Sequence, residues 1–214
     1  MNEPVPDDFI QYDFKPIPFH ADDDQLVKSF RSAPSVFTEF LNAYFSLPKK
    51  KSATFEQRLR NAAHLLVEAD MQPSHAIGLS LSFSAVEALV CEKTDGIVDE
   101  LSRHVATLLE PRARERPDSM AAVKKYYTLR SKTLHGDRIL GDANARWRVR
   151  ALAAAVFKAC LDWRRHIAMM GADVVRPHFL KELRDCSSTG QEIVGICPKL
   201  ARFIPTARNL QIEE

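Results

Sequence analysis

The feature that most limits the fold of this chain is a helical pattern of apolar residues, which begins near residue 54 and repeats in five stretches. Apolar residues at intervals of three and four predict amphipathic helices, because about 3.6 residues make one helical turn. The sequence holds only 7 glycines in 214 residues, which suits long helices better than the many tight turns of an all-β fold. We therefore expect an all-α protein, an antiparallel bundle of four to five long helices.

Capping residues, prolines and glycines set the ends of these stretches. The expected helices cover residues 54–67, 74–90, 97–109, 118–136 and 144–166. The second is apolar on most sides, which predicts a central place in the bundle. The last two flank a short loop, which predicts that they pack antiparallel to each other.

The first 51 residues differ in composition from the helical region that follows, because they are rich in prolines and acidic residues. Residues 1–51 are expected to form an irregular N-terminal extension. It would be partly extended, with one helix after Pro34, and three consecutive lysines at residues 49–51 end the extension. Residues 52–170 are expected to form the helical bundle. Residues 171–214 are expected to form a C-terminal tail with a short helix around 179–186.

Composition excludes several classes of protein. An apolar share of 45% supports a packed core without metal or disulfide bonds. The four cysteines lack the spacing of a zinc site, so we expect no metal and no other cofactor. No apolar run approaches the roughly 20 residues that span a bilayer, and no signal-peptide pattern is present, so we expect a cytoplasmic protein without membrane contact. A net charge of +2 does not by itself indicate nucleic acid.

The segment 126–138 carries more chemistry than any other, because it combines Arg130 with His135 at an expected helix end. Arginine holds phosphate with a planar fork of donors, and histidine exchanges protons near neutral pH. Arg130 and His135 are five positions apart, which places their side chains about 140° apart around an ideal helix. The two side chains can converge only if the helix ends at Gly136 and the His135 side chain can change its direction. Cations in a last helical turn also complement the helix dipole, and this explanation needs no function.

Two segments resemble a known family. The run Tyr127–Gly136, YTLRSKTLHG, resembles the Arg-x4-to-6-His motif of HEPN domains, particularly of their ApeA-like branch, and Phe83–Leu89 resembles the helix that carries an acidic residue in that family. The resemblance covers roughly residues 54–166. It implies a helical bundle, a metal-independent endoribonuclease in active members, and homodimers in which two Arg-His motifs meet. It also implies that Arg130 and His135 are catalytic and that Ser131 orients them.

Several further residues are candidates for supporting roles. Glu87 is costly to bury without a partner, so it either pairs with Arg130 or His135, or points to solvent or to another cation such as Lys93. Tyr127, at the start of the motif, is a second supporting candidate. Two cations, Lys132 and Arg138, are candidates for contacts with RNA phosphates.

Two other sets of residues have a packing interpretation. Trp147 and Trp163 are expected in the core or a dimer interface rather than as base-stacking platforms. The three arginines of the segment 146–150 alternate and cannot share one helix face, so a solvated surface is expected for them.

The leading functional hypothesis is a metal-independent endoribonuclease of HEPN type. His135 would act as general base or acid and Arg130 would stabilise the charged phosphate. The expected partners are RNA, a second copy of the chain, and an antitoxin or regulatory protein, since many relatives act in toxin-antitoxin, phage-defence or stress systems. The alternative is a noncatalytic helical module that dimerises or binds RNA, nucleotides or a protein.

Overall fold

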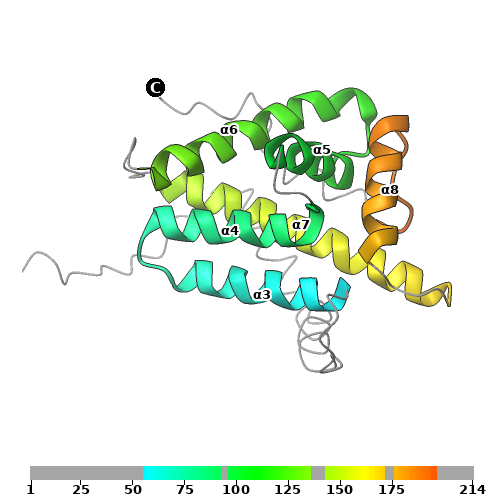
Figure 1. Ribbon diagram of the computed structural model, residues 1–214, viewed down its shortest axis with the longest axis horizontal. Helices are drawn as coiled ribbons and strands as arrows, with labels where there is room; N and C mark the ends of the chain where they lie inside the picture. Colours follow the sequence, from blue (N-terminus) through cyan, green and yellow to red (C-terminus); the bar gives the residue numbers. More distant parts are fainter. Residues whose placement is uncertain (1–54, 93–95, 136–142, 172–175, 197–214) are drawn as a thin grey trace, which may run out of the picture. The chain divides into compact units, whose positions relative to one another are not determined.

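The computed structural model describes residues 55–92, 96–135, 143–171 and 176–196, which all belong to the unit of the chain that spans residues 40–214. The expectations for residues 1–51, and for the last part of the tail, lie outside the described residues. The described part forms six α-helices and a 3-10 turn and contains no strand (Figure 1). In chain order they are α3 (Phe55–Met71), α4 (His75–Val90), α5 (Ile97–Leu109), η2 (Ala113–Glu115), α6 (Arg116–Leu134), α7 (Ala143–Met169) and α8 (Arg176–Thr189).

The all-α class is confirmed for this part of the chain, and each of the five expected helices is present within a few residues of its expected ends. Ser74 caps α4 as its position suggested, because its hydroxyl oxygen accepts a hydrogen bond from the backbone N–H of Ile77 at 3.4 Å. None of the helices that the structure describes combines the length and hydropathy of a bilayer-spanning segment.

Helix α4 is the centre of the bundle, as its apolar pattern predicted. It contacts α3, α5, α6 and α7, and Figure 1 shows it between α3 on one side and α6 on the other. Leu79, Phe83 and Leu89 are fully buried. A helix whose apolar residues lie on most of its sides can bury those sides only when other helices pack around it.

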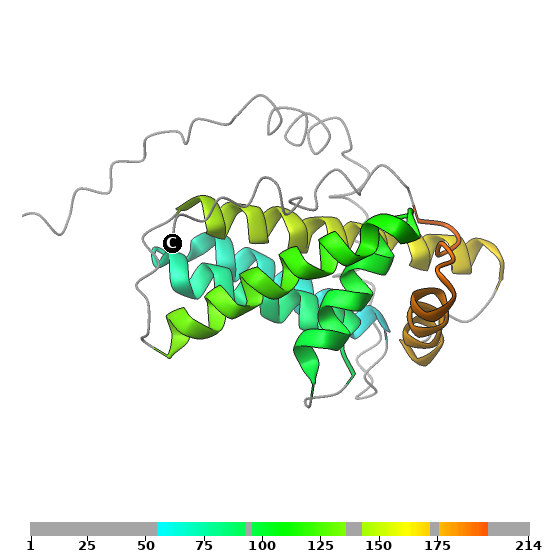
Figure 2. The same ribbon diagram turned by 90° about the horizontal axis from the view of Figure 1, so that it is seen from above.

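The expected pairing of the last two bundle helices is wrong. Helix α6 packs mainly on α5 and also on α4, and its contacts with α7 are few. Helix α7 packs instead on α4 and α3 (Figure 2). The buried side of α6, which includes Val123, Tyr126 and Leu129, faces these partners. The short loop between α6 and α7 therefore did not indicate which helices α6 packs against.

Helix α8 is longer than the short helix expected in the tail and takes part in the core. Its Phe179 ring lies 4.9 Å from the ring of Phe55 and 4.8 Å from that of Trp163, measured between centroids. The Trp163 indole N–H donates to a Glu182 carboxylate oxygen at 2.7 Å. Trp163 is therefore a core residue, as expected, with its polar atom satisfied.

The expectation of a solvated surface is wrong for Arg146, while Arg148 is exposed as expected and Arg150 lies in a surface ion pair. Arg146 is buried, and its Nη2 donates to the carbonyl oxygen of Ala69 at 2.6 Å, at the end of α3 where carbonyls lack intrahelical donors. Arg150 makes two bonds to the Asp70 carboxylate, at 2.6 and 2.7 Å. Gly78 makes room for this cap, since a Cβ there would lie 2.6 Å from Arg146 Nε.

Acid should weaken the packing of α5 on α4 through one buried histidine. The Nδ1–H of His104 donates to the carbonyl oxygen of Val90 at 2.6 Å, and the ring is 2% exposed. Burial lowers the pKa of His104 below its ordinary value of 6.5, against the opposing effects of the Val90 bond and of Glu100; Arg103 and Arg184 act in the same direction as burial. The unfolded chain therefore takes up this proton at a higher pH than the folded chain.

We expect the free energy of unfolding to fall as the pH drops below about 6.5, with a slope of at most about 1.4 kcal/mol per pH unit from this group. Urea unfolding of the wild type and of His104→Asn across this range measures the effect. The variant keeps an N–H donor but does not titrate, so its stability should depend less on pH. Equal pH dependence in the two proteins would contradict the assignment to His104.

Candidate functional site

The end of α6 presents His135 at the surface. The helix runs to Leu134, and His135 is the capping residue, with backbone angles φ −83° and ψ 0°. Its N–H donates to the Ser131 carbonyl oxygen at 3.0 Å, and its side chain is exposed. The helix thus ends where the sequence predicted, although Gly136 itself lies outside the described residues. The imidazole is left accessible at a helix terminus, where backbone restraint is weakest.

Arg130, one and a half turns earlier, points into the bundle. Its Nη1 lies 3.3 Å from Oε1 of Glu87 on α4 and donates to the hydroxyl of Tyr127 at 2.9 Å. The Arg130 and Glu87 side chains are 18% and 19% exposed. Nη2 of Arg130 makes no hydrogen bond with the part of the chain that the structure describes, so the guanidinium retains donors beyond those used in the cluster.

Tyr127 holds the Arg130 guanidinium from a second side. The guanidinium carbon lies 5.0 Å from the centre of the Tyr127 ring, within the range of a cation–π contact. The Tyr127 ring in turn meets Phe83 of α4 edge to face, with centroids 5.4 Å apart. Burial raises the pKa of the Tyr127 phenol, and the negative charge of Glu87 raises it further. The phenol is thus a neutral hydrogen-bonding group that fixes the arginine.

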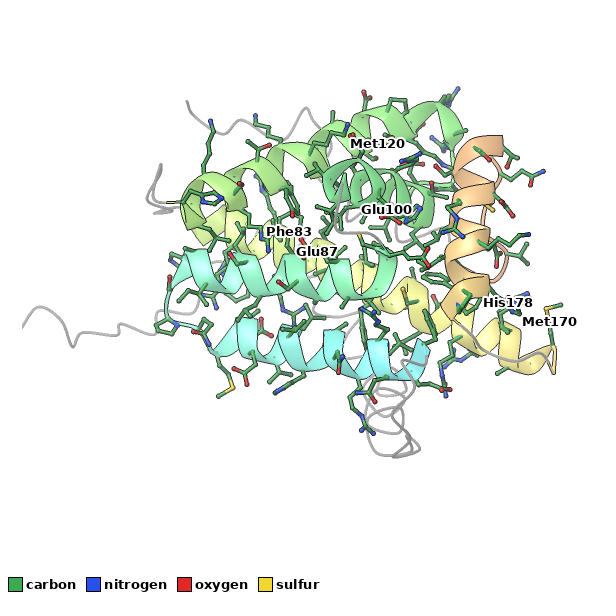
Figure 3. All side chains as sticks on the ribbon, viewed as in Figure 1. Phe83, Glu87, Glu100, Met120, Met170 and His178 are labelled. Atoms are coloured by element: carbon green, nitrogen blue, oxygen red, sulfur yellow. The ribbon has the colours of Figure 1, made fainter. Side chains whose placement is uncertain are left out.

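Of the two interpretations of Glu87, the salt bridge to Arg130 is the one found. Phe83 and Glu87 stand one turn apart on the side of α4 that faces α6 (Figure 3). Glu87 Oε1 and Arg130 Nε are buried and make no hydrogen bond with the described residues, so the 3.3 Å contact is an ion pair. We name Glu87, Tyr127 and Arg130 the arginine cluster.

The ion pair of the arginine cluster should couple the stabilities of α4 and α6. A double-mutant cycle with Glu87→Gln and Arg130→Met should give a coupling free energy of about 1–2 kcal/mol, because removing either partner leaves the other charge poorly solvated. Lys181 and Asp185 on α8 are the matched control: they lie at the same 3.3 Å but are 72% and 61% exposed. Their cycle should give a coupling close to zero. Similar couplings for the two pairs would contradict a structural role for Glu87.

The other residues predicted for the site do not join the arginine cluster. Ser131 offers its carbonyl oxygen to the His135 N–H, but within the described residues its side chain makes no hydrogen bond to Arg130 or His135. Lys132 is exposed on the outer side of α6. Arg138 lies outside the described residues. The structure therefore brings together Glu87, Tyr127 and Arg130, and leaves His135 apart from them.

Within one chain, Arg130 and His135 do not share a site. Arg130 is engaged by α4 while His135 faces solvent, as their angular separation on a helix suggested. A hollow of about 410 Å³ lies along the C-terminal half of α7, lined by Lys158, Asp162, His166 and the backbone near Gly195, and neither residue of the motif borders it. Among the described residues, no group of three His, Cys, Asp or Glu side chains is placed to hold a metal ion.

Four of the helix ends at the end of the bundle where His135 lies carry exposed apolar side chains. The C-terminal ends of α3 and α6 and the N-terminal ends of α4 and α7 meet there (Figures 1 and 2). They carry Met71, Ile77, Leu134 and Trp147, which we name the apolar end. Trp147 is 37% exposed and lies over the Arg146 guanidinium at 5.6 Å, so it is not a core residue.

Sequence reasoning missed two contributors to this region. The Phe83 ring packs edge to face against the Tyr127 ring. Phe83 lies four residues before Glu87, and residues four apart share a helix face, so this spacing could have identified Phe83 from the sequence. The apolar end left no such signal, because its four residues come from four helices. Comparison of the chain with protein-family models, with curated proteins and with solved structures gave no match.

Proposed function

We propose that this protein is a metal-independent endoribonuclease of HEPN type, in which Arg130 and His135 act on an RNA phosphate. The observation that carries the proposal is the arginine cluster: a guanidinium fixed by Glu87 and Tyr127, one and a half turns before an exposed histidine at a helix end. A fixed cation with unused donors suits the stabilisation of developing charge. An accessible imidazole suits proton transfer.

In the proposed reaction the RNA 2′-oxygen attacks the adjacent phosphorus, and the bond from phosphorus to the 5′-oxygen of the next nucleotide breaks. His135 takes the proton of the 2′-hydroxyl or delivers a proton to the leaving oxygen. Arg130 donates hydrogen bonds to the phosphate oxygens as negative charge builds up. The products are a 2′,3′-cyclic phosphate and a 5′-hydroxyl, and no metal or redox partner takes part.

The separation of Arg130 and His135 within one chain makes a second subunit part of the proposal. In a homodimer the histidine of one chain meets the phosphate bound by the arginine of its partner. The apolar end supports this arrangement, because Leu134, which directly precedes His135, is an exposed apolar side chain at the helix end that carries the motif. Exposed large apolar side chains at such a place suit a protein interface. An antitoxin or regulatory protein, as in toxin-antitoxin and phage-defence systems, would be a further partner.

Incubation of the purified protein with end-labelled RNA in EDTA tests the proposal directly. We expect cleavage, with products that end in a 2′,3′-cyclic phosphate. Light scattering of the same sample should give the mass of a dimer, and Leu134→Glu should reduce both the dimer fraction and cleavage. Absence of cleavage at any concentration of a dimeric sample rejects the enzymatic proposal.

One observation favours the alternative, a noncatalytic module that dimerises or binds RNA. The Arg130 guanidinium is largely enclosed by its own chain, and His135 faces outward singly. A protein that binds labelled RNA in a gel-shift assay, forms a dimer and leaves the RNA intact would support this second function.

A further inference from the structure

The proposed cleavage needs two proton-transfer groups, and Arg130 and His135 together supply one. A base must take the proton of the 2′-hydroxyl, and an acid must give a proton to the 5′-oxygen that leaves. In one turnover the His135 imidazole can begin in only one of these roles, and a guanidinium does not exchange protons near neutral pH. The other role requires a further group beside the arginine.

The arginine cluster contains a group of the right kind. Nη1 of Arg130 lies 3.3 Å from Glu87 Oε1 and donates to the Tyr127 hydroxyl oxygen at 2.9 Å. The Glu87 carboxylate, as the anion of an ion pair, accepts hydrogen bonds and has no proton to give. A phenol both carries a proton and donates it. Tyr127 is therefore the member of the cluster that can act as an acid.

The surroundings of Tyr127 keep its proton in place and its ring fixed. Burial raises the pKa of the phenol above its ordinary value of 10.0, and the charge of Glu87 raises it further, while Arg130 opposes both. Phe83 packs edge to face on the ring, and the Arg130 guanidinium lies against it. The side chain is only partly buried. Acceptors on adjacent donors of one guanidinium lie about 3–5 Å apart, so a phosphate on Arg130 brings its leaving oxygen to the hydroxyl directly or through one water.

We propose that Tyr127 is the general acid of the cleavage reaction and that His135 is its general base. The inference rests on the proposed function and adds the residue that completes it. The imidazole takes the 2′-hydroxyl proton, the 2′-oxygen bonds to phosphorus, and the bond from phosphorus to the 5′-oxygen breaks as the phenol gives this oxygen its proton. The phenolate beside Arg130 then regains a proton from the imidazolium through solvent, so no other reactant is consumed.

An RNA that carries sulfur in place of the leaving 5′-oxygen, at a cleavage site mapped with ordinary RNA, tests this assignment. A thiol ionises near pH 8.5, so a thiolate leaves without a proton donor, whereas an alkoxide needs one. Tyr127→Phe keeps the ring and loses only the hydroxyl. It should cleave ordinary RNA about 10²–10⁴-fold more slowly than the wild type, and the sulfur-substituted RNA within about threefold of the wild-type rate. His135→Ala should be slow on both, because the 2′-hydroxyl proton must still be removed.

Tyr126→Phe is the matched control, since it removes the same hydroxyl from the next position. Tyr126 is 1% exposed, so a substrate does not reach its hydroxyl, and this variant should cleave both RNAs at the wild-type rate. Equal losses of Tyr127→Phe on the two RNAs would show that the hydroxyl only positions Arg130, and would overturn the inference. Wild-type cleavage of ordinary RNA by Tyr127→Phe would reject the inference alone, whereas no cleavage by the wild-type protein rejects the proposed function and the inference with it.

The pH dependence of wild-type cleavage is a second measurement. The rate should rise through the range in which an imidazole loses its proton and then stay level to about pH 9, because the Tyr127 phenol is still protonated there. A second histidine as the acid would instead make the rate fall above about pH 7 and give a bell-shaped profile. A bell of that kind would contradict the assignment of Tyr127.

Discussion

The His135→Ala protein should cleave RNA in EDTA about 10²–10⁴-fold more slowly than the wild type, the range that general acid-base groups contribute. The side chain is exposed at the end of α6 and makes no core contact, so the substitution should leave the fold intact. Single-turnover cleavage of labelled RNA measures the rate. A slow rate at unchanged RNA affinity is expected, because the imidazole acts on the proton and not on binding.

A second exposed histidine serves as the control for the first. His178 lies on the surface of α8 (Figure 3), so His178→Ala removes the same group from a place with no proposed chemistry. Its cleavage rate should equal that of the wild type. Wild-type cleavage by His135→Ala, or equal losses in the two variants, would show that His135 is not the catalytic histidine.

Arg130 needs a gentler substitution, because its removal also leaves Glu87 without a partner. Arg130→Lys keeps a positive charge opposite Glu87 but loses the planar fork of donors. We expect a folded protein whose cleavage rate is reduced about 10²–10³-fold, as when one oxyanion donor is removed. A near-normal rate would indicate that Arg130 acts only as a charge in the bundle.

The Arg116→Met protein should lose about 3 kcal/mol or more of its free energy of unfolding. Arg116, 6% exposed, donates to three carbonyl oxygens: that of Glu110 at 3.0 Å, that of Cys186 at 3.0 Å and that of Gln191 at 2.7 Å. Burial lowers the pKa of its guanidinium, which nonetheless remains charged near neutral pH. Methionine fills similar space but leaves all three carbonyls without this donor, at about 1–3 kcal/mol each.

Urea unfolding measures this loss, and a fall in melting temperature of about 6–12 °C should accompany it in a domain of this size. Arg112→Met is the control. Arg112 lies four residues before Arg116 but is exposed, and its guanidinium pairs with Glu115 at the surface, so its replacement should have no measurable effect. Equal stability of the two variants would show that α8 is held without the Arg116 contacts.

The sequence determined the helices of the described part and the local chemistry of the motif. Apolar spacing placed α3 to α7 within a few residues, because amphipathic periodicity and capping act over one or two turns. The same local rules placed His135 at the end of α6 and predicted that it would not share a helix face with Arg130. The carboxylate of Glu87 could be recognised as needing a partner, though not as having Arg130 as that partner.

Tertiary structure alone decided which helix faces meet. Loop length suggested that α6 packs on α7, but the burial of Tyr126 and Leu129 directs it to α5 and α4. Arg146 was expected at the surface and nothing in the sequence singled out Arg116, yet both are buried and bind carbonyl oxygens that lie 70 or more positions away along the chain. A long-range backbone acceptor leaves no mark on the residues around the donor, because any peptide group can accept. The core, the arginine cluster and the apolar end are therefore products of packing, while the helices that carry them are products of local sequence.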